Sequence, residues 1–114
     1  MRSYTFGKRE RLAKRTEFET VMARGRKKKI DSTCTLFFLA NGLDRKRLGI
    51  IASKRIGNAV VRNRAKRKIR EVFRHIKNRI HPPMDIVVIS GRDLVRQSFS
   101  SLEEKISKTL LSNR

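Results

Sequence analysis

Apolar side chains recur every three or four residues between positions 58 and 80, a spacing that gathers them on one face of an α-helix. Asn58 precedes the first turn and is a residue type that commonly caps helices. The pattern predicts a long amphipathic helix whose buried face comprises Val61, Ala65, Ile69, Val72, Phe73, Ile76 and Ile80.

The polar side of the same helix carries a strong positive charge. From Lys54 to Arg79 there are eleven Lys or Arg residues and a single acid, Glu71. A face that is merely solvated normally mixes charges of both signs, because like charges four residues apart destabilise a helix. The whole chain has a formal net charge of +20, so we expect a polyanionic partner.

A helical projection at about 100° per residue divides these polar residues. Lys66 and Lys77 fall at the border of the apolar face, Arg64 and Lys68 on one flank, and the outward stripe comprises Asn63, Arg67, Arg70 and Arg74. Arginine can bridge two phosphate oxygens, and an asparagine amide can bond a base edge or a 2′-hydroxyl. We therefore expect an RNA-binding surface made of Lys54, Arg55, Asn58, Arg62, Asn63, Arg64, Lys66, Arg67, Lys68, Arg70 and Arg74.

Shorter patterns predict the first half of the fold. A helix is expected near 16–24, with Thr16 and Glu19 as a capping box and Gly25 as a left-handed stop. Residues 33–40 read as a strand that is apolar on both faces, with residues 2–15 irregular before the helix. The turn signals after position 40 predict an antiparallel hairpin with a second strand at 48–53.

The second half adds one strand and one helix. The β-branched run at 85–90 predicts a strand in the interior of the sheet. Leu102, Ile106 and Leu110 repeat every four residues, which predicts a last helix near 100–112, with Ser100 and Glu103 as its capping box. The length of 114 residues favours one domain, 1–114.

Several kinds of chemistry lack the necessary residues. Cys34, His75 and His81 do not have the spacing of a metal site, and the ten acids are scattered, so neither a zinc site nor a two-metal nuclease is expected. Cys34 is expected to be a buried core residue. No signal peptide and no apolar run long enough for a membrane span is present, so we expect a cytoplasmic protein with no membrane partner.

The run from Ser53 to Glu71, SKRIGNAVVRNRAKRKIRE, resembles the signature of the bacterial ribonuclease P protein subunit. The similarity extends outward through Arg11-Leu12, Phe18, Leu48-Gly49 and 84–88, so it covers nearly the whole chain. It implies a small α+β sandwich, with a central mixed, mostly antiparallel four-stranded sheet and about three helices. It also implies a left-handed β-α-β crossover through the basic helix, whereas chain handedness alone favours a right-handed one.

The resemblance also implies a function. Such a subunit binds the catalytic RNA that removes the 5′ leader of precursor tRNA, and a cleft between the first helix and the sheet holds that leader. The RNA carries the chemistry and holds most of the Mg2+, and the free protein is expected to be a monomer. The residues that match this cleft, directly or by their strand, are Arg11, Phe18, Met22, Thr35 and Phe37.

Other interpretations remain open at this point. Phe18 and Phe37 have core-like spacing and suit packing as well as leader binding, and Met22 stands where family members carry an aromatic residue. The cations at 24–29 suit either a loop beside the cleft or plain solvation. Charge alone also permits a ribosomal or other structural RNA-binding protein, and a DNA-binding protein ranks last because no zipper or zinc finger is present.

Overall fold

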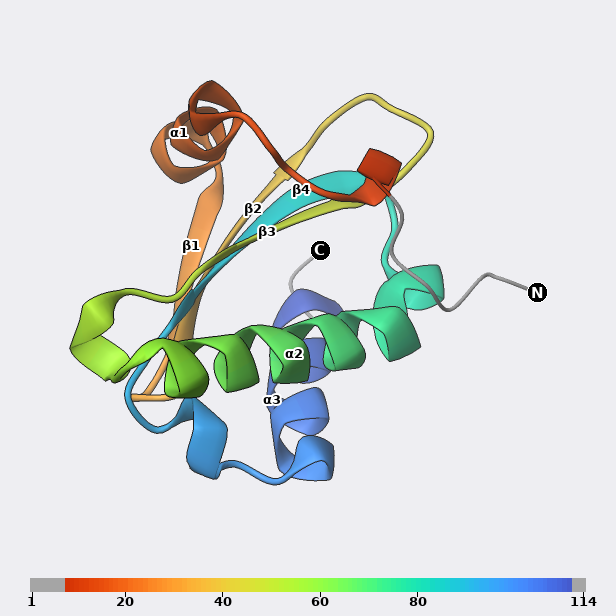
Figure 1. Ribbon diagram of the computed structural model, residues 1–114. Coiled ribbons are helices and arrows are strands. Elements are labelled where there is room, and N and C mark those ends of the chain that lie inside the picture. Colours follow the sequence, from red (N-terminus) through yellow and green to blue (C-terminus); the bar gives the residue numbers. More distant parts are fainter. Residues whose placement is uncertain (1–7, 112–114) are drawn as a thin grey trace.

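The computed structural model describes residues 8–111, and Figure 1 shows how their elements are arranged. Three α-helices and a four-stranded mixed sheet, joined by short 3-10 helices (η), make up this part of the chain, so the predicted α+β class is confirmed. The elements are η1 (Lys8–Glu10), α1 (Arg15–Arg24), β1 (Arg26–Ile30), β2 (Cys34–Ala40), β3 (Arg47–Ile51), η2 (Lys54–Ile56), α2 (Ala59–Ile76), η3 (Lys77–Arg79), β4 (Met84–Ser90), η4 (Leu94–Arg96) and α3 (Phe99–Leu111).

The sheet separates two apolar layers. Figure 1 shows α2 and α3 on one side of the sheet and α1 on the other. Leu36, Phe38 and Val88 belong to the larger core with α2 and α3, whereas Phe37 and Val87 belong to a smaller core with Val21 of α1. Because side chains alternate along a strand, the predicted two-sided burial of β2 is confirmed.

The predicted hairpin between β2 and β3 is wrong. The strand order is β1-β2-β4-β3, so β4 lies between them, antiparallel to β2 and parallel to β3. The Asn41 side chain does form a local turn with the Leu43 amide, but its amide group also donates to Asp85 Oδ1 on β4 at 2.8 Å. β4 buries both of its faces and is paired along both edges. The turn residues after position 40 do not indicate that β4 lies between β2 and β3.

Residues 26–30, expected to be loop cations, form the edge strand β1. This strand pairs with β2 alone, with Lys27 opposite Phe37 and Lys29 opposite Thr35. Lysines are common on edge strands because their charge opposes pairing with another chain. The high lysine content of these residues suggested a loop, but it is also typical of an edge strand.

The start of α1 differs from the expected capping box. Glu17 Oε1 accepts hydrogen bonds from the amides of Ala13 and Lys14, at 2.9 and 3.0 Å, so the cap lies two residues earlier than predicted. At the other end, Gly25 has an extended φ of −81° rather than the expected left-handed conformation. A Cβ there would lie 2.6 Å from the Val21 carbonyl oxygen, so close packing is what requires glycine.

The cap of α2 is confirmed, because Asn58 Oδ1 accepts a hydrogen bond from the Val61 amide at 3.0 Å. α2 connects β3 to the neighbouring parallel strand β4, so the expected β-α-β crossover through the basic helix is present. The cap of α3 is not at Ser100, because Ser98 Oγ accepts from the Ser101 amide at 3.2 Å. The predicted end of this helix at residue 112 lies outside the described residues.

Candidate nucleic-acid interface

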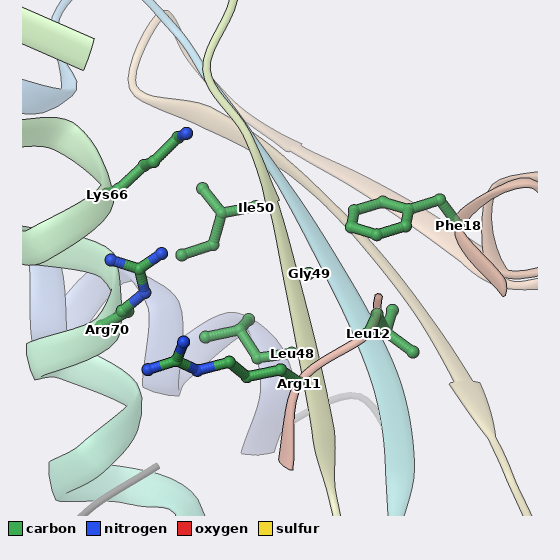
Figure 2. A pocket seen from close by; sticks show the side chains of 8 residues that line it. All are labelled: Arg11, Leu12, Phe18, Leu48, Gly49, Ile50, Lys66 and Arg70. Atoms are coloured by element: carbon green, nitrogen blue, oxygen red, sulfur yellow. The ribbon is translucent and has the colours of Figure 1, made fainter. Parts of the chain in front are cut away.

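Two adjoining hollows lie where α1, β3 and α2 meet, and together they form a cleft. The inner pocket has a volume of about 130 Å³ and is lined by Arg11, Leu12, Phe18, Leu48, Gly49, Ile50, Lys66 and Arg70 (Figure 2). The outer groove is wider and more open, and is lined by Ala13, Arg15, Phe18, Glu19, Met22, Ile50, Ile51, Ala52 and Lys66. The hollows share Phe18, Ile50 and Lys66, so they adjoin one another.

The segment before α1 is held along the outer edge of β3. The Leu12 amide donates to the Leu48 carbonyl oxygen at 3.0 Å, and Arg11 forms an isolated parallel bridge with Leu48. Leu12 is buried, whereas Arg11 is exposed and extends toward α2 (Figure 2). Residues 8–15 thus include structural contacts that their irregular sequence did not predict, and residues 2–7 lie outside the described part.

Phe18 occupies the centre of the cleft wall. Its ring lies against the backbone of Gly49, and Figure 2 shows it reaching from α1 toward β3. A glycine within a strand often marks a close approach of another group, and here that group is an aromatic ring. Gly49, Leu12 and Ile50 were missing from the expected site, although the glycine within an apolar strand was the available signal.

The other expected cleft residues divide into two groups. Met22 lines the outer groove, but Thr35 and Phe37 line neither hollow. Phe37 is buried beneath α1, and the Lys27 ammonium lies 5.8 Å from its ring centroid. Thr35 is half-buried opposite Lys29, on the same face of the sheet as Phe37. Phe37 thus packs in the core, as its spacing also allowed.

An ion network fixes the position of α1 on the sheet. Arg47 at the start of β3 bonds Glu17 Oε2 at 3.1 Å and Asp85 Oδ2 at 2.7 Å. Hydrogen bonds from the backbone at Lys14 and Ala13 lower the pKa of Glu17. Burial raises the pKa of Asp85, but hydrogen bonds from Arg47 and Asn41 outweigh that effect and lower it overall. The carboxylate that caps α1 thus also joins it to β3.

Five polar side chains form an exposed surface on α2 and the turn before it. We call this the outer basic surface, and it comprises Lys54, Arg55, Asn63, Arg64 and Arg67. Asn58 is also exposed, but its side-chain oxygen Oδ1 accepts the hydrogen bond that caps the helix. Cations without fixed partners suit contacts with the phosphates of a nucleic acid, because phosphate contacts need positive charge more than one fixed geometry.

Arg70 differs from the helical projection, whereas Lys66 lies at the border of the apolar face as projected. Both are half-buried and line the inner pocket, so Arg70 does not share the outward stripe of Asn63 and Arg67. Burial, and then the charge of Arg11, lowers the pKa of Arg70. The basic residues of α2 therefore face two directions, one outward and one into the cleft.

Three further cations of the expected surface are half-buried, and two of them form hydrogen bonds within the protein. Arg74 bonds both oxygens of Glu71 and lies near His75. Lys68 Nζ donates to the Gln97 carbonyl oxygen and to that of Val95, the latter at 2.8 Å. Arg62 is half-buried, and within residues 8–111 its Nε is buried without a hydrogen-bond partner. These side chains are less available to a nucleic acid than the outer basic surface.

Metal-ligating residues do not gather in the described part of the chain. Residues 8–111 contain no group of three or more His, Cys, Asp or Glu side chains placed to hold an ion. Cys34 is buried as predicted, and that burial raises the pKa of its thiol to about 12. None of the helices within 8–111 is long and apolar enough to cross a membrane.

Comparison with known sequences identifies relatives over nearly the full length. A family model described as ribonuclease P matches residues 6–113. The ribonuclease P protein component of Desulfosudis oleivorans is 38% identical over 109 residues, which cover 95% of this chain and 88% of that protein. That of Thermotoga petrophila is 37% identical and covers 93% of both chains.

Solved structures give the same result. The RNase P protein from Thermotoga maritima superposes with a TM-score of 0.81 at 34% identity, covering 92% of this chain and 98% of that one. The Staphylococcus aureus RNase P protein superposes with a TM-score of 0.78 at 31% identity, with coverages of 91% and 98%. The mixed sheet and three helices described above are thus shared with these structures.

Proposed function

This chain belongs to the ribonuclease P protein family, and from that premise we propose that its two basic surfaces bind different RNAs. As a member, it acts with an RNA subunit in the processing of the 5′ end of precursor tRNA, and the family match favours this role over the ribosomal alternative. We propose that the outer basic surface binds the catalytic RNA and that the cleft holds the 5′ leader of the precursor. This division into two RNA surfaces rests on one observation, namely that a cleft lies beside the basic helix and is separate from the outer basic surface.

The outer basic surface supports the proposal by its exposure and its lack of fixed partners. Lys54, Arg55, Arg64 and Arg67 are exposed, and none of them has an ion pair within residues 8–111. If the protein contacts about five phosphates of the folded RNA, the logarithm of affinity falls with the logarithm of salt concentration at a slope of roughly −4 to −5. Asn63 adds hydrogen bonds of the kind that recognise a base edge or a 2′-hydroxyl.

The cleft supports leader binding by its chemistry. Phe18 offers an aromatic ring, Met22 offers a polarisable thioether, and Arg15 and Lys66 add positive charge at the same groove. Single-stranded RNA is commonly held by aromatic side chains on which bases stack, together with cations that follow the backbone. We extend the leader site to the half-buried Thr35 on the neighbouring strand β2, whereas Phe37 packs beneath α1.

Further parts of the proposal concern the holoenzyme. We propose that Mg2+ is held mainly by the RNA, because the ligating side chains of residues 8–111 do not gather at one place. The phosphodiester chemistry then belongs to the RNA, and this chain binds substrate and screens the repulsion between two polyanions. We also propose that the chain is one domain, that the free protein is a monomer, and that it acts in the cytoplasm.

The primary test is cleavage of precursor tRNA by the cognate catalytic RNA at low Mg2+ concentration, with and without this protein. We expect the protein to increase the rate of cleavage and to favour precursor tRNA over mature tRNA. An absence of stimulation with correctly folded RNA would contradict the proposed function.

The leader site is tested with Phe18→Ala and Phe18→Leu in the holoenzyme. Losing one stacked base costs about 1–3 kcal/mol, or about 5- to 150-fold in affinity. We expect Phe18→Ala to lose that much affinity for precursor with a leader and almost none for mature tRNA. Phe18→Leu keeps an apolar contact with Gly49 but not the aromatic face, so it separates stacking from packing. Equal losses for both RNAs would exclude the leader assignment.

A further inference from the structure

β1 lies at one edge of the sheet, and one of its two long sides has no partner strand. The strand order is β1-β2-β4-β3, so β1 pairs with β2 on one side, and no strand of residues 8–111 pairs along the other (Figure 1). Such an edge presents a row of amide and carbonyl groups with which another extended chain can pair. β3, which lines the cleft, is the opposite edge of the sheet.

The side chains of β1 make this edge strongly positive. Four of its five residues are cations, Arg26, Lys27, Lys28 and Lys29. Lys28 is half-buried, and the other three are exposed. Lys27 lies over the ring of Phe37, but none of the four cations has an ion pair within residues 8–111. The positive charge of this edge is therefore not compensated by acids of the described chain.

An apolar pocket lies at the end of the edge where β1 begins, and we call it the edge pocket. It has a volume of about 300 Å³ and is lined by Arg26, Phe38, Leu39, Ala40, His81, Pro82, Met84 and Leu110. No acidic residue lines it, and none of its residues lines the cleft. Because Arg26 belongs to both, the pocket and the positive edge adjoin each other.

The two faces of β1 differ in what they present. Lys27 and Lys29 lie on the α1 side of the sheet, whereas Ile30 packs against the larger core on the other side. Arg26 stands opposite Phe38 of that core, so the edge pocket lies on the same side as Ile30. A strand added to this edge would continue both faces, because side chains alternate. Acidic side chains would then suit the α1 side, and aliphatic ones the side of the pocket.

We propose that the free edge of β1 binds an extended acidic segment of a partner protein. The segment adds a strand to the four-stranded sheet and places an apolar side chain in the edge pocket. Its chemistry is an alternation of carboxylate and aliphatic side chains. In strand addition, backbone hydrogen bonds supply affinity and side-chain pockets supply specificity. The inference goes beyond the proposed function, because β1 belongs neither to the cleft nor to the outer basic surface.

Two other occupants suit this edge less well. A second copy of the chain would set the cations of one β1 against those of the other, and like charges directly opposite destabilise a pair of strands. RNA would be attracted by the positive charge, but the carbonyl oxygens of a strand edge repel phosphates, and an apolar pocket offers a phosphate no donor. An acidic peptide satisfies the charge, the backbone groups and the pocket together.

The first experiment uses the full-length protein and a capped peptide of about eight residues, alternating glutamate and isoleucine, which spans the length of β1. Hydrogen exchange of the β1 amides is followed by NMR with and without the peptide. We expect saturable binding and slower exchange of the outward-facing amides of Arg26–Ile30.

Two control peptides have the same charge. One has its glutamates gathered in a block, and the other has two adjacent backbone amides methylated, which removes a donor whichever of its edges pairs with β1. Both should bind more weakly and protect β1 less. Equal binding and protection by the controls would show only attraction to a net charge of +20, and would overturn the proposal.

The second experiment compares two charge reversals at exposed positions. Lys29→Glu should weaken peptide binding by about 3- to 10-fold, because it replaces an attractive cross-strand pair with a repulsive one. Arg92→Glu changes the net charge equally outside β1 and should weaken binding much less. Equal effects of the two reversals would contradict strand addition at β1.

The edge pocket is tested with Ala40→Ile, which fills it from an exposed position. The wild-type protein should bind the isoleucine peptide more tightly than a peptide of alternating glutamate and alanine. Ala40→Ile should remove most of that difference and keep binding of the alanine peptide. An unchanged difference would exclude the pocket as the site of the apolar side chain.

Assembly with the cognate catalytic RNA distinguishes the other occupants. We expect the peptide to bind the free protein and the holoenzyme alike. Loss of peptide binding on assembly, or protection of the same amides by precursor tRNA, would assign the edge to RNA. A concentration-dependent dimer that the peptide dissociates would assign it to a second copy. Either result would overturn the proposal, whereas stimulation of cleavage by the same preparation tests the proposed function separately.

Discussion

The ring of Phe18 lies so close to the backbone of Gly49 that a Cβ at position 49 would be 2.5 Å from the ring atom Cε2. Gly49→Ala must therefore displace the ring, and overpacking of this kind typically costs about 1–3 kcal/mol. We expect the variant to lose affinity for leader-bearing precursor, as expected for Phe18→Ala, and to keep its affinity for mature tRNA. Equilibrium binding to both RNAs measures the difference.

Gly42→Ala is the matched control for this prediction. Gly42 has a φ of +68°, so alanine there is strained, but nothing lies near its Cβ position. It should lower the free energy of unfolding without changing leader binding. If both glycine variants changed leader binding equally, lost stability rather than displacement of Phe18 would explain the result.

Arg67 is exposed on α2 and does not line the cleft. Arg67→Ala should weaken binding to the catalytic RNA and reduce the salt slope by about 1, because one phosphate contact is removed. Leader-dependent affinity should not change. Titrations at several salt concentrations test this, and an unchanged slope would remove Arg67 from the proposed surface.

The Arg47 network predicts how stability depends on pH. The pKa of Asp85 and that of Glu17 are both lowered in the folded protein. A carboxyl group with a lowered folded pKa stabilises the protein above its unfolded pKa, and this contribution is lost as the pH falls through the folded value. The free energy of unfolding should therefore decrease as the pH falls below about 4, the ordinary range for these groups.

Asp85→Asn should flatten that acid dependence and lower stability near neutral pH. Removing one partner of a buried ion pair typically costs about 3–5 kcal/mol, and the side chains of Arg47 and Asp85 are only 18% and 9% exposed. Asp44→Asn is the control, because Asp44 is exposed and surface ion pairs contribute little. Urea unfolding between pH 3 and pH 7 compares the variants, and equal curves would contradict the role of the network.

Lys68 and Arg64 lie on the same flank of α2 but should behave differently. Lys68 donates to two backbone carbonyls before α3, whereas Arg64 is exposed. Lys68→Met should lower the free energy of unfolding by about 1–3 kcal/mol, because it leaves those carbonyls without a donor. Arg64→Gln should change stability little and weaken RNA binding. Thermal unfolding and salt-dependent RNA titration distinguish the two, and equal effects on both readouts would contradict the distinction.

Cys34 should be unreactive in the folded protein. Its pKa of about 12 leaves almost no thiolate at pH 8, and the side chain is buried. A thiol reagent at pH 8 should modify the native protein only as fast as it opens, and modify the protein in urea at once. Rapid modification without denaturant would show that the site is more open than described.

Local patterns predicted those features that depend on neighbouring residues. Asn58 caps α2 as expected, the residues from Ala65 to Ile76 on its apolar face are buried, and the alternation along β2 separates the two cores. These outcomes follow from helical and strand periodicity, which operates over a few residues. The long signature at 53–71 was specific enough to indicate the family before any contact was known.

Features that depend on distant partners were missed or misplaced. β1 is recognisable as a strand only through its pairing with β2, and the position of β4 between β2 and β3 depends on burial of both its faces. Glu17 replaced the expected capping pair because it also meets Arg47, thirty residues later in the chain. Such contacts have no local sequence pattern.

The sequence by itself determined that this chain is a basic RNA-binding protein with one amphipathic helix at its centre, because charge and periodicity are properties of the sequence. Only the tertiary structure decided which way the cations face. Arg70 belongs with Arg11 in the inner pocket rather than with Arg67, since the segment before α1 pairs along β3 and brings Arg11 toward α2. A helical projection cannot include a neighbour contributed by another element, and that neighbour creates the pocket.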